Sequence, residues 1–260
     1  MKKTKWLAAC MAACALALVA GCSSEGGDDG GSELPGIEYD AAKWVIEDTT
    51  VVRYIGAEAD VRIPDGVTII EDNAFKDCKS LKSVTIPNGV TSIGESAFEG
   101  CTSLESVTIP ASVMSIGRRA FYYCESLKSV RIPDGVTAIE DFTFSFCDNL
   151  ASVTIGNGVK RIERCAFQRC GIINSLTIPG SVKIIESMAF FNCRVVSVTI
   201  DYGVEGIESD AFSCFGTSIL KEVKYGGTAE QWKQANISPK AFSGTPDFKI
   251  TDKEGKEITE

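Results

Sequence analysis

The chain has 260 residues, 44% of them hydrophobic, and a net charge of −9 from 35 acidic and 26 basic residues. This acidic balance argues against a nucleic-acid-binding protein, which needs clustered lysine and arginine. The sequence has no histidine, which excludes His-based acid–base chemistry, Ser-His and Cys-His nucleophile pairs and histidine-ligated metal.

The first 21 residues have the features of a signal peptide. Three lysines precede an apolar run over residues 6–20, which is short for a membrane span. The run ends in the letters LVAGC, which resemble a bacterial lipobox with Cys22 as the lipidated residue. A plain secretory signal or an uncleaved anchor is the alternative. Cleavage before Cys22 would take the net charge from −9 to −12, because residues 1–21 contain three lysines and no acid.

Residues 22–36 are predicted to be the lipidated cysteine and a flexible linker. Residues 23–36 contain five glycines and almost nothing apolar, so they should behave as a tether spanning about 20 Å. Ser23 stands where an aspartate would indicate retention at the inner membrane. We therefore expect an exported, lipid-anchored protein of the bacterial outer membrane or cell surface.

Residues 37–62 are predicted to form an N-terminal capping hairpin. Apolar residues alternate around Trp44 and again around Val51, on either side of Glu47-Asp48-Thr49. A stacked array needs such an end, because its outermost strand otherwise offers free backbone groups to any neighbour.

A period of 23 residues then organises the chain. Seven isoleucines recur at this spacing, with one interval of 22, and a phenylalanine follows each by twelve residues: Phe75, Phe98, Phe121, Phe144, Phe167, Phe190 and Phe212. A fixed period in this range is typical of a solenoid, in which each coil buries its apolar side by stacking on the next.

One unit shows how a coil is built. Leu81, Val84 and Ile86 have the L-x-x-L-x-L spacing of a leucine-rich repeat, and the last two should lie on the inner face of a short strand. Residues 87–89, Pro-Asn-Gly, turn the chain, because proline presets φ and glycine accepts a positive φ. The phenylalanine should then pack under the strand.

The ending of each unit resembles a known family. The A-F-x-x-C motif after I-G, as in residues 93–101, is similar to the BspA-like leucine-rich repeat family of bacterial surface proteins. The resemblance covers about residues 61–225. It implies a leucine-rich repeat solenoid of the α/β horseshoe class, strand-rich with short helical turns and parallel stacked strands. We place seven repeats of about 23 residues in an array over residues 63–225.

Residues 226–260 are predicted to be a C-terminal cap. Thr228 and Gln231 have the capping-box spacing for a short helix that carries Trp232. Trp232 and its N-terminal counterpart Trp44 either pack in the caps or stack on a ligand. Residues 248–259, with Gly255 in the turn, are expected to form a terminal hairpin.

Stacked coils place equivalent residues about 5 Å apart, so columns matter more than local motifs. The first column consists of cysteines, which we expect to be free core thiols, with some disulfides or a metal as alternatives: Cys78, Cys101, Cys124, Cys147, Cys170 and Cys193. Cys165 and Cys214 fall outside the column and are expected to be the more reactive thiols.

A second column is acidic and consists of Glu71, Glu140, Glu163, Glu186 and Glu208. Neighbouring arginines and lysines favour a solvated, salt-bridged stripe, and binding of a divalent cation is the alternative.

The third column lies just before the cysteine and contains Tyr123, Phe146 and Arg169 in three consecutive coils, with Tyr122 beside them. These residue types are common in binding hot spots, although they can also simply cover the turn. On the outward strand face, Arg131 is the one break in a ladder of serines and threonines. The candidate binding residues are therefore Tyr122, Tyr123, Arg131, Phe146 and Arg169.

These features predict a non-enzymatic surface lipoprotein without a cofactor. We expect a monomer, anchored to the membrane at Cys22, whose solenoid binds a protein or glycan on host or neighbouring cells. The alternative is a structural or assembly component of the envelope that binds other bacterial proteins or glycans. A catalytic residue is not predicted, because no nucleophile and base pair is evident.

Overall fold

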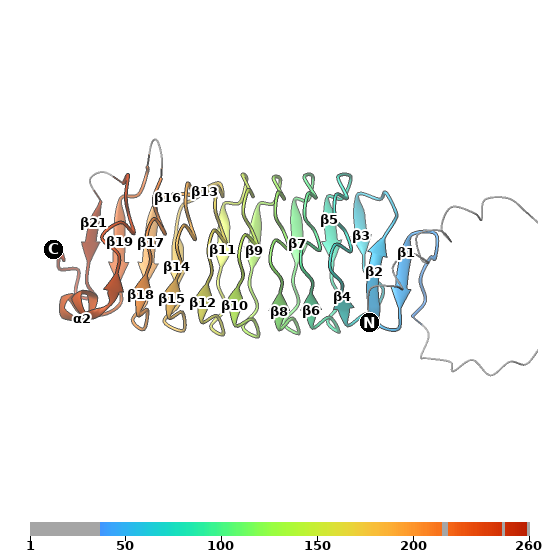
Figure 1. Ribbon diagram of the computed structural model, residues 1–260, viewed down its shortest axis with the longest axis horizontal. Helices are drawn as coiled ribbons and strands as arrows, with labels where there is room; N and C mark the ends of the chain where they lie inside the picture. The colour runs from blue at the N-terminus through green and yellow to red at the C-terminus, as the bar shows by residue number, and fades with distance from the viewer. Residues whose placement is uncertain (1–36, 215–217, 246–247, 259–260) are drawn as a thin grey trace, which may run out of the picture. The chain divides into compact units, whose positions relative to one another are not determined.

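A computed structural model describes residues 37–214, 218–245 and 248–258 (Figure 1). The predicted signal peptide, the lipidation site Cys22 and the linker up to residue 36 lie outside the described residues.

Each coil of the array contributes one short strand to each of two opposite faces, and successive coils lie side by side (Figure 1). The first face carries β1 (Trp44–Glu47), β2 (Thr50–Tyr54), β4 (Ile69–Ile70), β6 (Ser92–Ile93) and β8 (Ser115–Ile116), then β10 (Ala138–Ile139), β12 (Arg161–Ile162), β15 (Ile184–Ile185), β18 (Gly206–Ile207) and β20 (Asn236–Ile237). The second carries β3 (Asp60–Arg62), β5 (Ser83–Thr85), β7 (Ser106–Thr108), β9 (Ser129–Arg131) and β11 (Ser152–Thr154), then β14 (Leu176–Ile178), β17 (Ser197–Ile200), β19 (Glu222–Tyr225) and β21 (Lys249–Thr251).

The strands pair in parallel with the predicted register. Val84 lies opposite Val107 and Ile70 lies opposite Ile93, one period apart. Val84 is buried whereas Thr85 is exposed, because successive side chains of a strand point to opposite faces. The parallel stack confirms the predicted leucine-rich repeat solenoid.

The phenylalanines of successive coils stack in a continuous column through the core. Ring centroids lie 4.8–5.3 Å apart with interplanar angles of 3–15°, from Phe75 to Phe242. Tyr54 stacks on Phe75 at 5.2 Å and extends the column toward the N-terminus. Phe242 belongs to a further coil, so the stack continues into the region that we predicted to be a cap.

The turns after the first-face strands have a left-handed residue at two positions, four residues apart. The first position is occupied by Asn73, Ser96, Arg119, Phe142, Cys165, Met188 and Asp210. The second is occupied by Asp77, Gly100, Tyr123, Phe146, Arg169 and Asn192. These residues interrupt the right-handed backbone, so the predicted short helical turns are hydrogen-bonded turns instead. Each turn donates to the next coil, as from Phe98 N to Ala120 O at 2.7 Å.

The cysteine column lines the core beside the phenylalanines. All eight cysteines in the described part of the chain have free thiols, as expected for the column. From Cys101 to Cys193, the Sγ of each column cysteine donates to the carbonyl oxygen of the phenylalanine one coil earlier, at 2.6–3.4 Å. The carbonyls of Phe75, Phe98 and Phe121 also accept the backbone N–H of the cysteine three residues later, so at these positions the thiol is a second donor.

The two ends of the stack are closed by different elements. β1 pairs antiparallel with β2, and Trp44 is 7% exposed, with its ring 4.7 Å from that of Tyr54. At the other end α2 (Ala229–Gln234) has the predicted capping box of Thr228 and Gln231. Trp232 packs edge-on against Tyr225 at 5.1 Å, so both tryptophans pack in the described structure.

The terminal hairpin is formed by β21 and an antiparallel bridge between Thr251 and Glu257. Gly255, with a φ of 79°, lies in its turn. Among the described residues, none of the helices has the length and apolarity needed to cross a membrane.

Candidate functional site

Three of the predicted binding residues form one stacked group. The rings of Tyr123 and Phe146 lie 4.6 Å apart at an angle of 17°, and the guanidinium of Arg169 lies 4.9 Å from the centroid of Phe146. Tyr122 meets Tyr123 edge-on at 4.5 Å and Phe146 at 5.6 Å. The one-coil offset between successive turns brings these side chains together.

A second group, which was not predicted, joins the first through Tyr122. The ring of Phe142 lies 6.2 Å from Tyr122 and has the guanidiniums of Arg118, Arg119 and Arg164 within 5.6–5.9 Å of its centroid. The one indication in the sequence was that Phe142 occupies the position that Asn73 and Ser96 hold in earlier coils. We call the combined set the aromatic–arginine cluster: Arg118, Arg119, Tyr122, Tyr123, Phe142, Phe146, Arg164 and Arg169.

The backbone under the aromatic–arginine cluster is unfavourable for the residues that it carries. Arg119, Tyr123, Phe142 and Phe146 have φ values of 57–62°, in the left-handed region that bulky residues rarely adopt. The earliest coils place residues suited to that conformation, such as Asn73 and Gly100, at equivalent positions. Local backbone preference therefore does not explain the aromatic residues.

The cationic groups of the cluster have few anionic partners. The described ion pairs include Arg169 with Asp148, at 4.0 Å, but none of them involves Arg118, Arg119 or Arg164. The Nε of Arg119 is buried without a hydrogen-bond partner in the described structure. The arginines are thus oriented over aromatic rings, where cation–π attraction replaces pairing with carboxylates.

Exposure differs within the cluster. Tyr123 is 38% exposed, and the Arg118, Arg164 and Arg169 side chains are also exposed, whereas Tyr122, Phe142 and Phe146 are half-buried. Burial, followed by the neighbouring Tyr123, raises the pKa of Tyr122, so its hydroxyl stays protonated at neutral pH. The cluster therefore offers a surface of aromatic faces and guanidinium groups without an ionisable acid–base pair.

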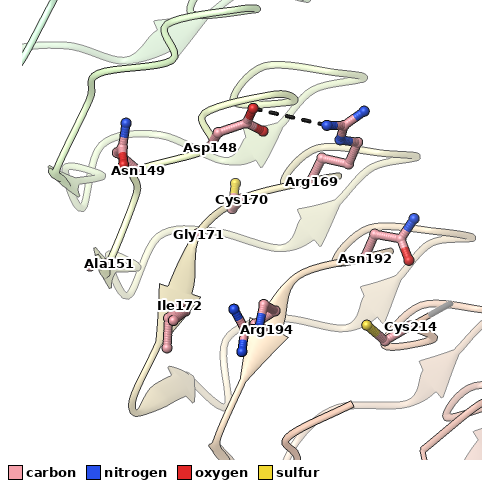
Figure 2. Close-up of a pocket in the computed structure, with 10 residues that line it drawn as sticks. All are labelled: Asp148, Asn149, Ala151, Arg169, Cys170, Gly171, Ile172, Asn192, Arg194 and Cys214. Atoms are coloured by element: carbon pink, nitrogen blue, oxygen red, sulfur yellow. Dashed lines mark ion pairs between the residues drawn. The ribbon is translucent and has the colours of Figure 1, made fainter. Parts of the chain in front are cut away.

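A pocket of about 620 Å³ adjoins the cluster at Arg169 (Figure 2). Asp148 and Arg169 lie at one side, and Arg194 and Ile172 come from the short parallel pair β16 (Arg194–Val195) and β13 (Ile172–Ile173). The pocket was not predicted.

Arg131 is not part of this arrangement. It lies on β9 in the outward strand face, next to Thr154 of β11. Its role in binding stays a prediction.

The acidic stripe is salt-bridged in part, at Glu163 and Glu186. Arg161 contacts Glu186 and lies 4.0 Å from Glu163, and Ser187 N donates to Glu208 Oε2 at 3.0 Å. Burial, then the charge of Glu186, raises the pKa of Glu163. Within the described residues, there is no group of three or more cysteine, aspartate or glutamate side chains that could hold a metal ion.

That Cys165 and Cys214 are more reactive than the thiols of the cysteine column stays a prediction. Both are buried, and burial raises the pKa of each thiol, which lowers its thiolate fraction. Cys78, a member of the column, is the described thiol with intermediate exposure.

Comparison with known proteins decides the family. A sequence profile described as BspA type leucine rich repeat region, with six copies, matches residues 57–173 and 166–245. The chain belongs to the BspA-type leucine-rich repeat family. No curated protein sequence matches this BspA-type chain significantly.

Three solved structures show similarity to the BspA-type array. The leucine rich repeat protein of T. pallidum is 28% identical with a TM-score of 0.56, over 64% of this chain and 90% of that one. A leucine rich cell surface protein of Faecalibacterium prausnitzii is 26% identical with a TM-score of 0.49, over 85% and 77%. The pneumococcal vaccine antigen PcpA is 18% identical with a TM-score of 0.52, over 72% and 54%, and shares the fold. The BspA-type fold indicates a protein-interaction module.

Proposed function

We propose that this chain is a surface lipoprotein whose BspA-type array binds a macromolecule on host or neighbouring cells through the aromatic–arginine cluster. The observation that carries the proposal is the placement of Arg119, Tyr123, Phe142 and Phe146 in left-handed backbone. Such conformations cost about 1–3 kcal/mol each and persist where the surrounding structure imposes them, commonly at binding sites.

The residue types support recognition of a macromolecule. Tyrosine and arginine are enriched among binding hot spots, and the stacked rings of Tyr123 and Phe146 offer a pre-ordered contact surface. A pre-ordered side chain loses less conformational entropy on binding than a mobile one. The cluster is therefore built to contact a partner with little rearrangement.

The proposed location rests on the N-terminal sequence. The apolar run and the cysteine of the lipobox-like motif would supply an acylated anchor, and residues 23–36 would supply the tether. A Cys22→Ser variant should be released from the membrane fraction. If it stays in that fraction, a lipid at Cys22 is not the anchor.

The binding surface is tested by the double variant Tyr123→Ala/Phe146→Ala. Binding of the purified chain to host extracellular-matrix extract and to bacterial surface extract should fall by at least about thirtyfold, corresponding to about 2 kcal/mol. Tyr202→Ala is the matched control, because Tyr202 is 60% exposed and lies outside the cluster.

Circular dichroism and thermal unfolding should show that the double variant is folded. Binding that is unchanged in the folded double variant rules out the cluster as the contact surface. An array that resists protease on intact cells rules out the surface adhesin and favours an internal envelope component.

A further inference from the structure

The pocket beside the cluster arises from a change in the coil that follows Cys170. In the preceding coil Asp148 and Asn149 form a turn after the cysteine, whereas Gly171 leads directly into the strand β13. A Cβ at Gly171 would lie 2.7 Å from Asp148 O, a distance at which backbone atoms must move. Glycine therefore allows β13 to pass close to the turn, and Asp148 and Asn149 of that turn line the pocket together with Gly171 (Figure 2).

The pocket has one positive charge more than its acidic side chains can balance. Arg169 has one ion pair, with Asp148 at 4.0 Å, and that guanidinium also lies over Phe146. Arg194 lines the pocket, is exposed, and takes part in none of the ion pairs among the described residues. A planar guanidinium fork matches a carboxylate, so a ligand with a single carboxylate fits this charge.

The remaining polar groups suit hydroxyls. Asn149 and Asn192 line the pocket, and a side-chain amide both donates and accepts hydrogen bonds, as a sugar hydroxyl does. The amide of Asn149 is held in place by donating to Glu125 O at 2.9 Å. Apolar side chains are few in the lining, with Ile172 the largest, so an apolar peptide side chain would gain little area there.

We propose that this pocket binds an acidic sugar, a hexuronate or a related carboxylated unit of a glycan, with Arg194 as the main carboxylate contact. The inference rests on the proposed function and deepens it, because it names the ligand class at the edge of the same surface. Tyr123 and Arg169 both pack on the ring of Phe146, and the ring of Tyr123 is exposed. A further sugar unit of the same glycan could therefore stack on Tyr123.

The test compares methyl β-D-glucuronide with methyl β-D-glucoside, which differ only at C6, where the first has a carboxylate and the second a hydroxymethyl group. Both are titrated into the full chain, with binding followed by NMR of the sugar. The glucuronide should bind at least about tenfold more tightly than the glucoside, as expected for one charge-assisted contact. Arg194→Gln should remove this preference. Arg62→Gln is the control, because Arg62 is an exposed arginine whose ion pair is with Asp65.

Equal binding of the two sugars, or no saturable binding of the glucuronide, overturns the inference. It is also overturned if Arg194→Gln keeps the preference, or if acetyl-glutamate amide binds as tightly as the glucuronide, which would indicate a peptide site. Failure here is separable from failure of the proposed function, because Tyr123→Ala/Phe146→Ala tests partner binding in extracts without reference to the pocket.

Discussion

The coil of residues 86–108 and the coil of residues 132–154 have the same interior and different turns. Phe98 and Phe144 are both fully buried and stacked between two other phenylalanines. Their left-handed positions differ: Ser96 and Gly100 in the first, Phe142 and Phe146 in the second. The core thus requires only the inner columns, and the turn positions are available to carry a surface of another chemistry.

The largest effect on stability is expected from removing one core phenylalanine ring, and comparing this loss between the two coils tests whether their interiors are equivalent. Phe98→Ala and Phe144→Ala should each lower the free energy of unfolding by about 3–5 kcal/mol, because each removes a ring with close contacts on both faces. Denaturant unfolding of the two variants measures both losses. Losses that differ by more than about 2 kcal/mol would show that the diverged turn also supports the core.

A smaller effect is expected at the turn itself. Tyr123→Asn should change the free energy of unfolding by less than about 1 kcal/mol, because relief of the left-handed strain, about 1–2 kcal/mol, offsets the lost ring contact, about 0.5–1.5 kcal/mol. The same unfolding experiment measures it. A loss as large as that of Phe98→Ala would make Tyr123 a structural residue and remove the stability argument for a binding role.

The smallest effects on stability are expected from changes in pH. They have opposite signs at Glu58, near the N-terminal end of the stack, and at Glu163, in the acidic stripe. Lys43, at 2.6 Å, and the Tyr54 hydroxyl hold the pKa of Glu58 at about 2, so its stabilisation is present above pH 4.5 and is lost as the pH falls toward 2. The pKa of Glu163 is raised by burial, so its favourable contribution is present below pH 4.5 and is lost as the pH rises above it.

Thermal midpoints recorded between pH 2 and pH 7 separate the two groups. Glu58→Gln should flatten the profile below pH 4.5, and Glu163→Gln should flatten it above that value. A Glu58→Gln profile that matches the parent at low pH would contradict the assigned contact with Lys43.

The sequence predicted the interior well, because its columns repeat at a fixed spacing that only a stacked coil satisfies. Phe242 was not predicted to belong to the phenylalanine column, because it follows Phe212 at a longer spacing than the other members of the column. The left-handed turns could not be predicted where they matter most, since Tyr123 and Phe146 lack the residue preferences of Asn73 and Gly100.

The site was predicted in part. Tyr122, Tyr123, Phe146 and Arg169 were found through one column, and the structure brings them together. Phe142 and Arg119 belong to another column, and Arg118 and Arg164 to the column one residue before it; the members of both columns vary too much to suggest a site. The pocket depends on how closely β13 approaches the preceding turn, which Gly171 permits, but a single glycine in the sequence does not by itself indicate a pocket.

The backbone ladder between turns has a consequence for how such proteins change in length. Because the hydrogen bonds of a turn that leave its own coil go to adjacent coils, as from Phe98 N to Ala120 O, an in-frame duplication of 23 residues would insert one coil and leave the pairing of the other coils unchanged. The duplication would shift the cluster along the stack by about 4.8 Å relative to one end. Gene duplication could therefore set how far a binding surface stands from its attachment point while leaving both the surface and the core intact.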